Sequence, residues 1–205
     1  MSGIVGSKLN TRGSGLVAKL GTDGQVFTSS GAGVSQAFEA AAGGGVVVQI
    51  VQTQKTDVTS FDTGDNATFT DMSGLSCAIT PTKAGSKILI HVNLGVGAYQ
   101  NVVGGFLLTA DIDGAGYNSL LTGDVDSSST RAWSGGHWQS NKRTISITSG
   151  SYLWTPSYTL TDVLTVQPQV SGGGGTGSRI NGSSDNNNGS YNARGTSDLT
   201  LWEIN

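Results

Sequence analysis

The chain has 205 residues, of which only 12% are charged, and its formal net charge is −3 at neutral pH. A disordered chain would combine a high net charge with few aromatic residues, and this composition excludes that class. Nucleic acid is excluded as a partner because no cluster of lysine and arginine occurs along the sequence to neutralise phosphates. The length allows one large β domain or a smaller one with an appendage.

Residues 1–45 contain eleven glycines, no proline and only scattered apolar residues. Ordering a backbone costs roughly 1–2 kcal/mol per residue, most for glycine, and isolated apolar side chains offset little of that cost. We therefore predict an extended N-terminal arm that has no core of its own and anchors the protein on a larger assembly. The residues predicted to anchor it are Arg12, Leu16, Lys19, Leu20, Phe27 and Phe38.

Within the arm, the sequence predicts a turn at 21–24 that leads into a short alternating stretch at 25–28. The alanine-rich stretch 34–42 favours a short helix, although nine residues are marginal for a helix without packing. Three glycines at 43–45 then form a hinge. The predicted domains are therefore an anchoring arm at 1–45 and a globular domain at 46–205.

The globular domain is predicted to be all-β. Residues 46–53 are mostly β-branched and too few for a typical helix, which predicts a buried first strand. Residues 87–94 alternate, with Ile88, Ile90, Val92 and Leu94 on one face. Further strands are expected at 75–80, 106–113, 130–139, 142–149, 151–155, 160–170 and 196–204. Short strands with frequent turns predict an antiparallel β-sandwich or jelly roll, and the glycine-rich segment 172–189 a long polar surface loop.

No constellation of residues predicts catalysis. The two histidines, His91 and His137, lack the local spacing of a metal pair, and His91 falls at an outward position of its strand. Four aspartates could bind Ca²⁺ or cleave a glycosidic bond, but aspartate beside glycine is usually a turn residue. These are Asp111, Asp113, Asp124 and Asp126. Nucleophile elbows and phosphate-binding loops are missing too, so we predict no enzyme activity, no metal and no cofactor.

Aromatic residues are concentrated in the globular domain, at Trp133, Trp138, Tyr152, Trp154 and Tyr158. If they were exposed, they would form a patch for stacking on sugars or binding a partner. If they were buried, they would belong to the core, which is the commoner fate of aromatic residues in strands. Trp133 and Trp138 are the candidates for a possible contact with a glycan or a partner.

The remaining motifs concern the compartment. The single cysteine, Cys77, excludes an intrachain disulfide, and its position in an alternating strand predicts a small core residue. The chain lacks an apolar run of 18 residues and a charged-then-apolar leader, so we expect a soluble protein without a secretion signal. The glycosylation sequons at Asn66, Asn181 and Asn188 would matter only in a secreted eukaryotic protein.

Several stretches resemble virion proteins of marine and cyanobacterial tailed phages. In the arm these are Ile4-Val5-Gly6-Ser7-Lys8-Leu9-Asn10, Arg12-Gly13-Ser14-Gly15-Leu16-Val17 and Leu20-Gly21-Thr22-Asp23-Gly24-Gln25-Val26-Phe27-Thr28-Ser29. The globular domain adds stretches similar to the head domains of phage fibre and capsid-surface proteins. These are Ile79-Thr80-Pro81-Thr82-Lys83-Ala84-Gly85-Ser86-Lys87-Ile88-Leu89-Ile90 and Leu199-Thr200-Leu201-Trp202-Glu203-Ile204.

The resemblance implies a non-enzymatic virion component, assembled in the host cytoplasm, with a jelly-roll head of the tumour necrosis factor and C1q type. It also implies a homotrimer that binds other virion proteins, either the major capsid protein or tail and fibre proteins, and no membrane. Because no repetitive shaft lies between arm and head, we expect a capsid decoration (cement) protein tethered by its arm. The alternative is a short tail fibre or receptor-binding protein whose head binds a host-surface glycan, and a glycan hydrolase is a further, formal alternative.

The last predicted strand indicates where subunits of such a trimer would meet. It carries apolar residues on both faces, so one face can pack on the core while the other needs a second cover. The predicted oligomer-interface residues are Leu199, Leu201, Trp202 and Ile204.

Overall fold

A computed structural model describes residues 4–5, 8–10, 16–19, 25–28, 37–40, 45–64, 67–98, 102–127, 129–135, 141–173, 178–185 and 189–205. The chain divides into two compact units, Met1–Val46 and Val47–Asn205. All regular elements within the described ranges are β-strands, so none of these ranges holds a helix long and apolar enough to cross a membrane.

The first unit holds two small antiparallel sheets. One joins β1 (Ile4–Val5), β2 (Lys8–Asn10) and β3 (Leu16–Lys19), and the other joins β4 (Gln25–Thr28) and β5 (Ala37–Ala40). The short helix predicted over 34–42 is therefore wrong. A nine-residue helix without packing is marginal, whereas here the two stretches pair as strands, with Phe27 in register with Phe38.

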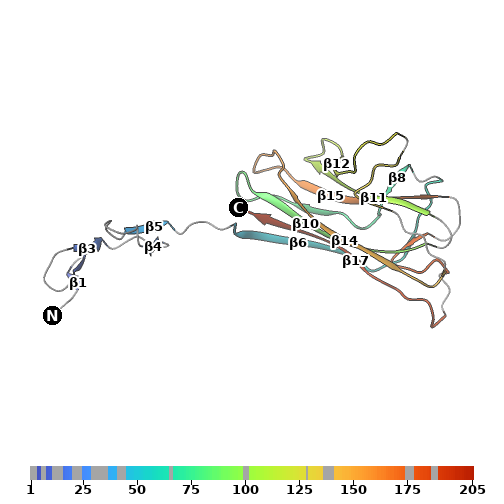
Figure 1. The fold of residues 1–205 in the computed structure, drawn as a ribbon, viewed down its shortest axis with the longest axis horizontal. Coiled ribbons are helices and arrows are strands. Elements are labelled where there is room, and N and C mark those ends of the chain that lie inside the picture. The colour runs from blue at the N-terminus through green and yellow to red at the C-terminus, as the bar shows by residue number, and fades with distance from the viewer. Residues whose placement is uncertain are drawn as a thin grey trace. The chain divides into compact units, whose positions relative to one another are not determined.

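The second unit is an antiparallel β-sandwich, as predicted (Figure 1). The first sheet has the order β6-β17-β10-β14, extended by short β16 and β7. Its strands are β6 (Val47–Lys55), β7 (Thr59–Ser60), β10 (Lys87–Gly97), β14 (Ser146–Trp154), β16 (Arg179–Ile180) and β17 (Ser197–Ile204). The second sheet has the order β12-β11-β15-β8, with β13 on β11 and β9 on β15. Its strands are β8 (Phe69–Asp71), β9 (Cys77–Ile79), β11 (Val102–Ile112), β12 (Asn118–Leu121), β13 (Ser134–Gly135) and β15 (Leu164–Gly173).

The connections give this sandwich a jelly-roll arrangement. The chain crosses from β6 to β8 and β9 in the opposite sheet, returns to β10, and crosses again to β11 and β12. The chain then contributes β14 to the first sheet and β15 to the second. Finally it adds β17 to the first sheet, between β6 and β10. Interleaved crossings of this kind are the Greek-key pattern of jelly rolls.

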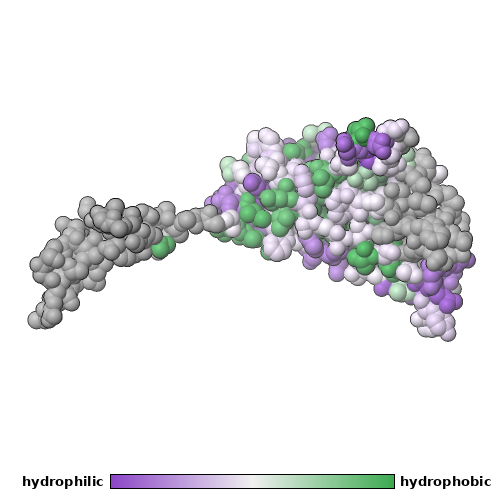
Figure 2. Space-filling view, viewed as in Figure 1, coloured by the Kyte–Doolittle hydropathy of each residue, from purple (hydrophilic) through white to green (hydrophobic). Residues whose placement is uncertain are grey.

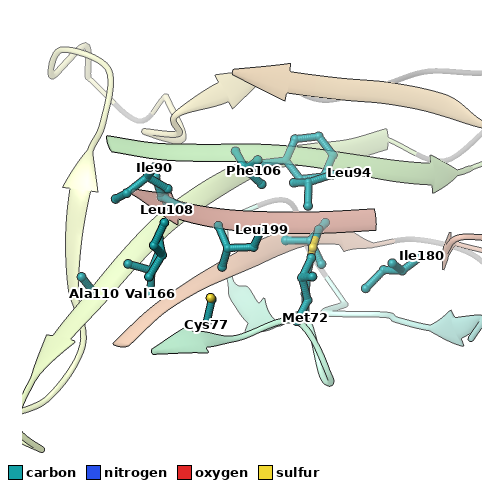
Figure 3. Packing of buried hydrophobic residues seen from close by; sticks show 14 of the residues in the cluster. Met72, Cys77, Ile90, Leu94, Phe106, Leu108, Ala110, Val166, Ile180 and Leu199 are labelled. Atoms are coloured by element: carbon teal, nitrogen blue, oxygen red, sulfur yellow. The ribbon is translucent and has the colours of Figure 1, made fainter. Parts of the chain in front are cut away.

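The core lies between the two sheets (Figure 3). The predicted inward face of β10 is confirmed, since Ile88, Ile90, Val92 and Leu94 are each at most 1% exposed. Alternate residues of β11 and β15, including Phe106, Leu108, Ala110 and Val166, complete the core from the other sheet. Cys77 belongs to it as well, 3% exposed, which confirms the predicted core cysteine. Its burial raises the pKa of the thiol above the ordinary value, so Cys77 is a poor nucleophile.

The prediction of a buried first strand is wrong, since Val47 and Ile50 of β6 are 43% and 54% exposed.

Three predicted strand boundaries are also wrong. The expected strands at 142–149 and 151–155 form one strand, β14, because Gly150 takes part in the ladder and leaves room for a neighbour. A Cβ at Gly150 would lie 2.6 Å from Cζ2 of Trp133. Residues 155–163 form a loop before β15, and the described part of 130–139 contains only the two-residue β13.

Candidate functional site

An apolar row crosses the outer face of the first sheet. The register places Trp202 of β17 between Ile50 of β6 and Leu89 of β10, and Leu89 opposite Leu153 of β14. We call Ile50, Trp202, Leu89 and Leu153 the apolar row. Ile50 and Leu153 are 54% and 46% exposed, whereas Trp202 and Leu89 are half-buried. A contiguous exposed apolar surface of this kind usually marks an interaction site.

The row continues toward the end of the domain where β6 begins and β17 ends. There Val47, 43% exposed, is the partner of Ile204. Figure 2 shows hydrophobic residues gathered near this end of the domain. The indole Nε1 of Trp202 is buried and has no acceptor among the described residues. A buried N–H without an acceptor is energetically costly.

Polar residues occupy the next rows of the same face. Gln52 Nε2 donates to Thr200 Oγ1 at 3.1 Å, and His91 Nδ1 lies 3.0 Å from Ser151 Oγ. Beyond them, Asn93 Nδ2 donates to an Asp198 carboxylate oxygen at 3.1 Å. His91 is therefore an outward-facing member of a cross-strand polar pair, in agreement with its predicted strand position.

The structure corrects half of the predicted oligomer interface. Leu199 and Leu201 are both 0% exposed, because the inner face of β17 packs on the second sheet. They belong to the core of their own chain and cannot contact another subunit. Trp202 and Ile204 lie on the outer face of β17 and are partly exposed.

The structure places the four candidate aspartates in or beside turns. The Asp111 carboxylate accepts the backbone N–H groups of Gly114 at 2.8 Å and Gly116 at 2.5 Å, which closes the turn between β11 and β12. Asp113 lies in that turn with a φ of 53°. Asp124 accepts the N–H of its neighbour Val125 at 2.7 Å, and the carbonyl of Asp126 closes another turn. Across the described ranges, no group of three or more histidine, cysteine, aspartate or glutamate residues is placed to hold a metal.

Trp133 is not an exposed side chain on which a glycan could stack. Its backbone N–H donates to the carbonyl of Phe106 at 2.7 Å, while its indole rests on Gly150 in the opposite sheet and packs against the core. Its position between the sheets explains why the residue is only partly exposed. Trp138 and His137 lie outside the described residues. Trp154 is a core residue, and Tyr152 and Tyr158 pack against the core.

Of the predicted anchoring residues, Arg12 and Leu20 lie outside the described residues. Leu16 and Lys19 are the end residues of β3, Phe27 lies in β4, and Phe38 is a half-buried residue of β5.

The structure also brings together two segments that sequence reasoning did not connect. Ser146 and Ile180 pair with Val96 from opposite sides, so residues 141–145, which precede β14, and residues 181–185, which follow β16, lie at the same end of the sheet. The guanidinium of Arg143 lies 4.9 Å from the ring centroid of Tyr191. Counting the charges along the sequence would have shown the stretches 141–145 and 178–195 to be basic, but not that they are neighbours.

Comparison with known proteins gives no family for the chain. No protein-family model matches the sequence, and no curated protein matches it.

Proposed function

We propose that the protein is a non-enzymatic structural component of a tailed-phage virion, in which a trimeric head is held by the N-terminal arm. Decoration of the capsid surface is the role that a compact head on a short arm fits best. The apolar row is the observation behind the proposed self-association, because its four residues extend across all four long strands of the first sheet and are at least partly exposed. The phage setting and the three-fold symmetry rest on the resemblance of the sequence stretches.

The charge of the outer face supports self-association. Among these registered strand pairs, the outer face carries Lys87 and Asp198, one charge of each sign. The other two charged residues of the pairs, Lys55 and Glu203, are buried. Two copies of such a face do not repel each other, and closed cyclic symmetry is the common outcome for identical subunits. Three arms on one trimer would then act together, and their combined attachment would far exceed that of one arm.

Introducing a charge into the apolar row is expected to dissociate the oligomer. The best position is Ile50, whose side chain is 54% exposed, because Ile50→Lys leaves the core of the subunit intact. We expect light scattering to show an oligomer for the wild-type protein and mostly monomer for Ile50→Lys at about 10 µM, since an unpaired buried charge costs several kcal/mol. The replacement Trp202→Lys should have the same effect.

The matched control is Val125→Lys, since Val125 is 67% exposed and lies in the loop after β12 of the other sheet. This control should keep the wild-type mass. A wild-type protein that is monomeric at this concentration would contradict the proposed self-association.

The arm is expected to be needed for attachment and not for folding. Residues 46–205 should remain folded and soluble when expressed alone, because the second unit contains the whole described hydrophobic core. They should nevertheless fail to bind phage particles from which the full-length protein has been removed. Co-sedimentation with such particles measures this, and normal decoration by the truncated protein would disprove the tether.

A further inference from the structure

Positive charge is concentrated at one end of the sandwich. Residues 46–205 carry eight basic and twelve acidic residues, a net charge of −4. Residues 141–145 form one segment, and the described residues 178–185 and 189–195 form the other. Together they carry four of those basic residues and one acidic residue, Asp185, a net of +3, which leaves −7 for the rest. We call these two segments the basic end; its basic residues are Lys142, Arg143, Arg179 and Arg194.

The basic end lies away from the point where the chain enters the domain. Val47 and Lys87 both pair with Ile204 at one end of the first sheet. Ser146 and Ile180 pair with Val96 at the other. A ligand bound there would leave the apolar row free.

Tyr191 is the central feature of this end. Its side chain is 72% exposed, and the Arg143 guanidinium lies over its ring from the other segment. Arg143, Arg194 and Lys142 of the basic end are exposed as well. The ion pair found within the described ranges joins Lys55 and Asp57, so Arg143 and Arg194 have no carboxylate partner there.

Hydrogen bonds hold the two segments in place. Asp185 N–H donates to the carbonyl of Lys142 at 3.1 Å, which ties one segment to the other. Asn192 N–H donates to the carbonyl of Gly189 at 3.0 Å, closing the turn that presents Tyr191, and Ser183 Oγ bonds Asn192 Oδ1 at 3.2 Å. A surface fixed in this way loses little conformational entropy when it binds a ligand.

An acidic sugar is the ligand class that these features fit. Exposed arginines bind carboxylate or sulfate groups through paired N–H donors, and an exposed tyrosine offers a flat face for a sugar ring together with a hydroxyl. A nucleic acid is a poorer fit, because its affinity rests on many phosphate contacts and this end offers only four cations. We propose that the basic end binds an acidic polysaccharide, with Arg143 and Arg194 holding the acidic groups and Tyr191 stacking on a ring. This inference goes beyond the proposed structural role and does not depend on it.

The test uses the full chain and three immobilised polymers: polygalacturonate, dextran sulfate and neutral dextran. Biolayer interferometry should show binding to at least one acidic polymer and none to dextran, and the preferred polymer distinguishes a carboxylate from a sulfate ligand. Raising NaCl from about 50 mM to about 500 mM should weaken the binding strongly. The double variant Arg143→Gln/Arg194→Gln should bind at least about tenfold more weakly. Tyr191→Ala should lose about fivefold, whereas Tyr191→Phe should keep most of the affinity.

The matched control is Lys87→Gln, which removes one exposed positive charge at the opposite end of β10 and should bind like the wild type. Circular dichroism and thermal melting should be unchanged for all these surface variants. Absence of binding to both acidic polymers, an equal loss in Lys87→Gln, or tighter binding to single-stranded DNA than to either polysaccharide would each overturn the proposal.

Discussion

Asn181→Ala is expected to lower the free energy of unfolding of the sandwich domain by about 4 kcal/mol. Asn181 is 0% exposed, and its Nδ2 donates to the carbonyls of Lys55 at 2.8 Å and Asp57 at 3.2 Å. Its Oδ1 accepts the Ser197 hydroxyl at 2.6 Å. Alanine would leave these buried groups without partners and would also occupy a left-handed backbone conformation, φ 61°, that alanine disfavours.

Urea denaturation followed by tryptophan fluorescence at one fixed protein concentration measures the loss. The control is Asn181→Gly, which removes the same hydrogen bonds but accepts the left-handed conformation, so it should be about 1 kcal/mol more stable than the alanine variant. A loss below about 1 kcal/mol in the alanine variant would show that Asn181 does not join β6, β16 and β17 as described.

Asn181 also shows what a motif means once the fold is known. The sequence Asn181-Gly182-Ser183 matches a glycosylation sequon, yet a side chain that is 0% exposed cannot be modified in the folded protein. The backbone N–H of Asn181 donates to the carbonyl of Gly95 in β10. Its partners Gly95 and Lys55 are 86 and 126 residues away in the sequence, and Ser197 is 16 residues away in another strand. Local sequence patterns cannot identify such partners.

The fold was predictable where a strand has one buried face. The alternation of Ile88, Ile90, Val92 and Leu94 correctly predicted the inner face of β10, because period-two patterning follows directly from the pleat. The face of β17 was harder to predict, since Leu199, Leu201, Trp202 and Ile204 are apolar on both sides. Only the register with β6 and β10 shows that the leucines face the core.

The candidate surfaces were less predictable because they depend on contacts between distant segments. Trp133 was a reasonable candidate for an exposed aromatic residue, but Gly150 in the other sheet provides the space that its indole fills. The sequence did not identify Tyr191 as a candidate, since an isolated tyrosine in a polar loop belongs to no recognisable motif. It becomes a candidate through Arg143, a residue that only the strand pairing brings near it.

Glu203→Gln is expected to destabilise the domain by about 3 kcal/mol at neutral pH. The carboxylate is 0% exposed and accepts hydrogen bonds from the backbone N–H groups of Thr82 at 3.0 Å and Lys83 at 2.9 Å. It also accepts from Ser86 Oγ at 2.9 Å and Gln49 Nε2 at 2.8 Å. A glutamine amide would replace one accepting oxygen by a donor that faces other donors, so the 80–86 turn would lose its attachment to β17.

The same contacts predict how stability depends on pH. Burial raises the pKa of Glu203, but the hydrogen bonds from Thr82, Gln49, Lys83 and Ser86 outweigh it and hold the pKa below the ordinary value. A carboxylate whose pKa is lower in the folded state stabilises the protein fully above its unfolded pKa, about 4.3 for glutamate. That contribution disappears as the pH falls through the lower, folded pKa.

The difference in unfolding free energy between wild type and Glu203→Gln should therefore be largest near pH 7 and shrink progressively below about pH 4.3. Urea titrations at pH 7, 5, 4 and 3 measure it directly. The control is Asp162→Asn, since the Asp162 carboxylate accepts from Thr159 in an exposed turn and removal of its charge should change stability little. If the wild-type and glutamine proteins were equally stable at pH 7, or if their difference were unchanged at pH 3, the buried carboxylate would not be what fixes the 80–86 turn on the last strand.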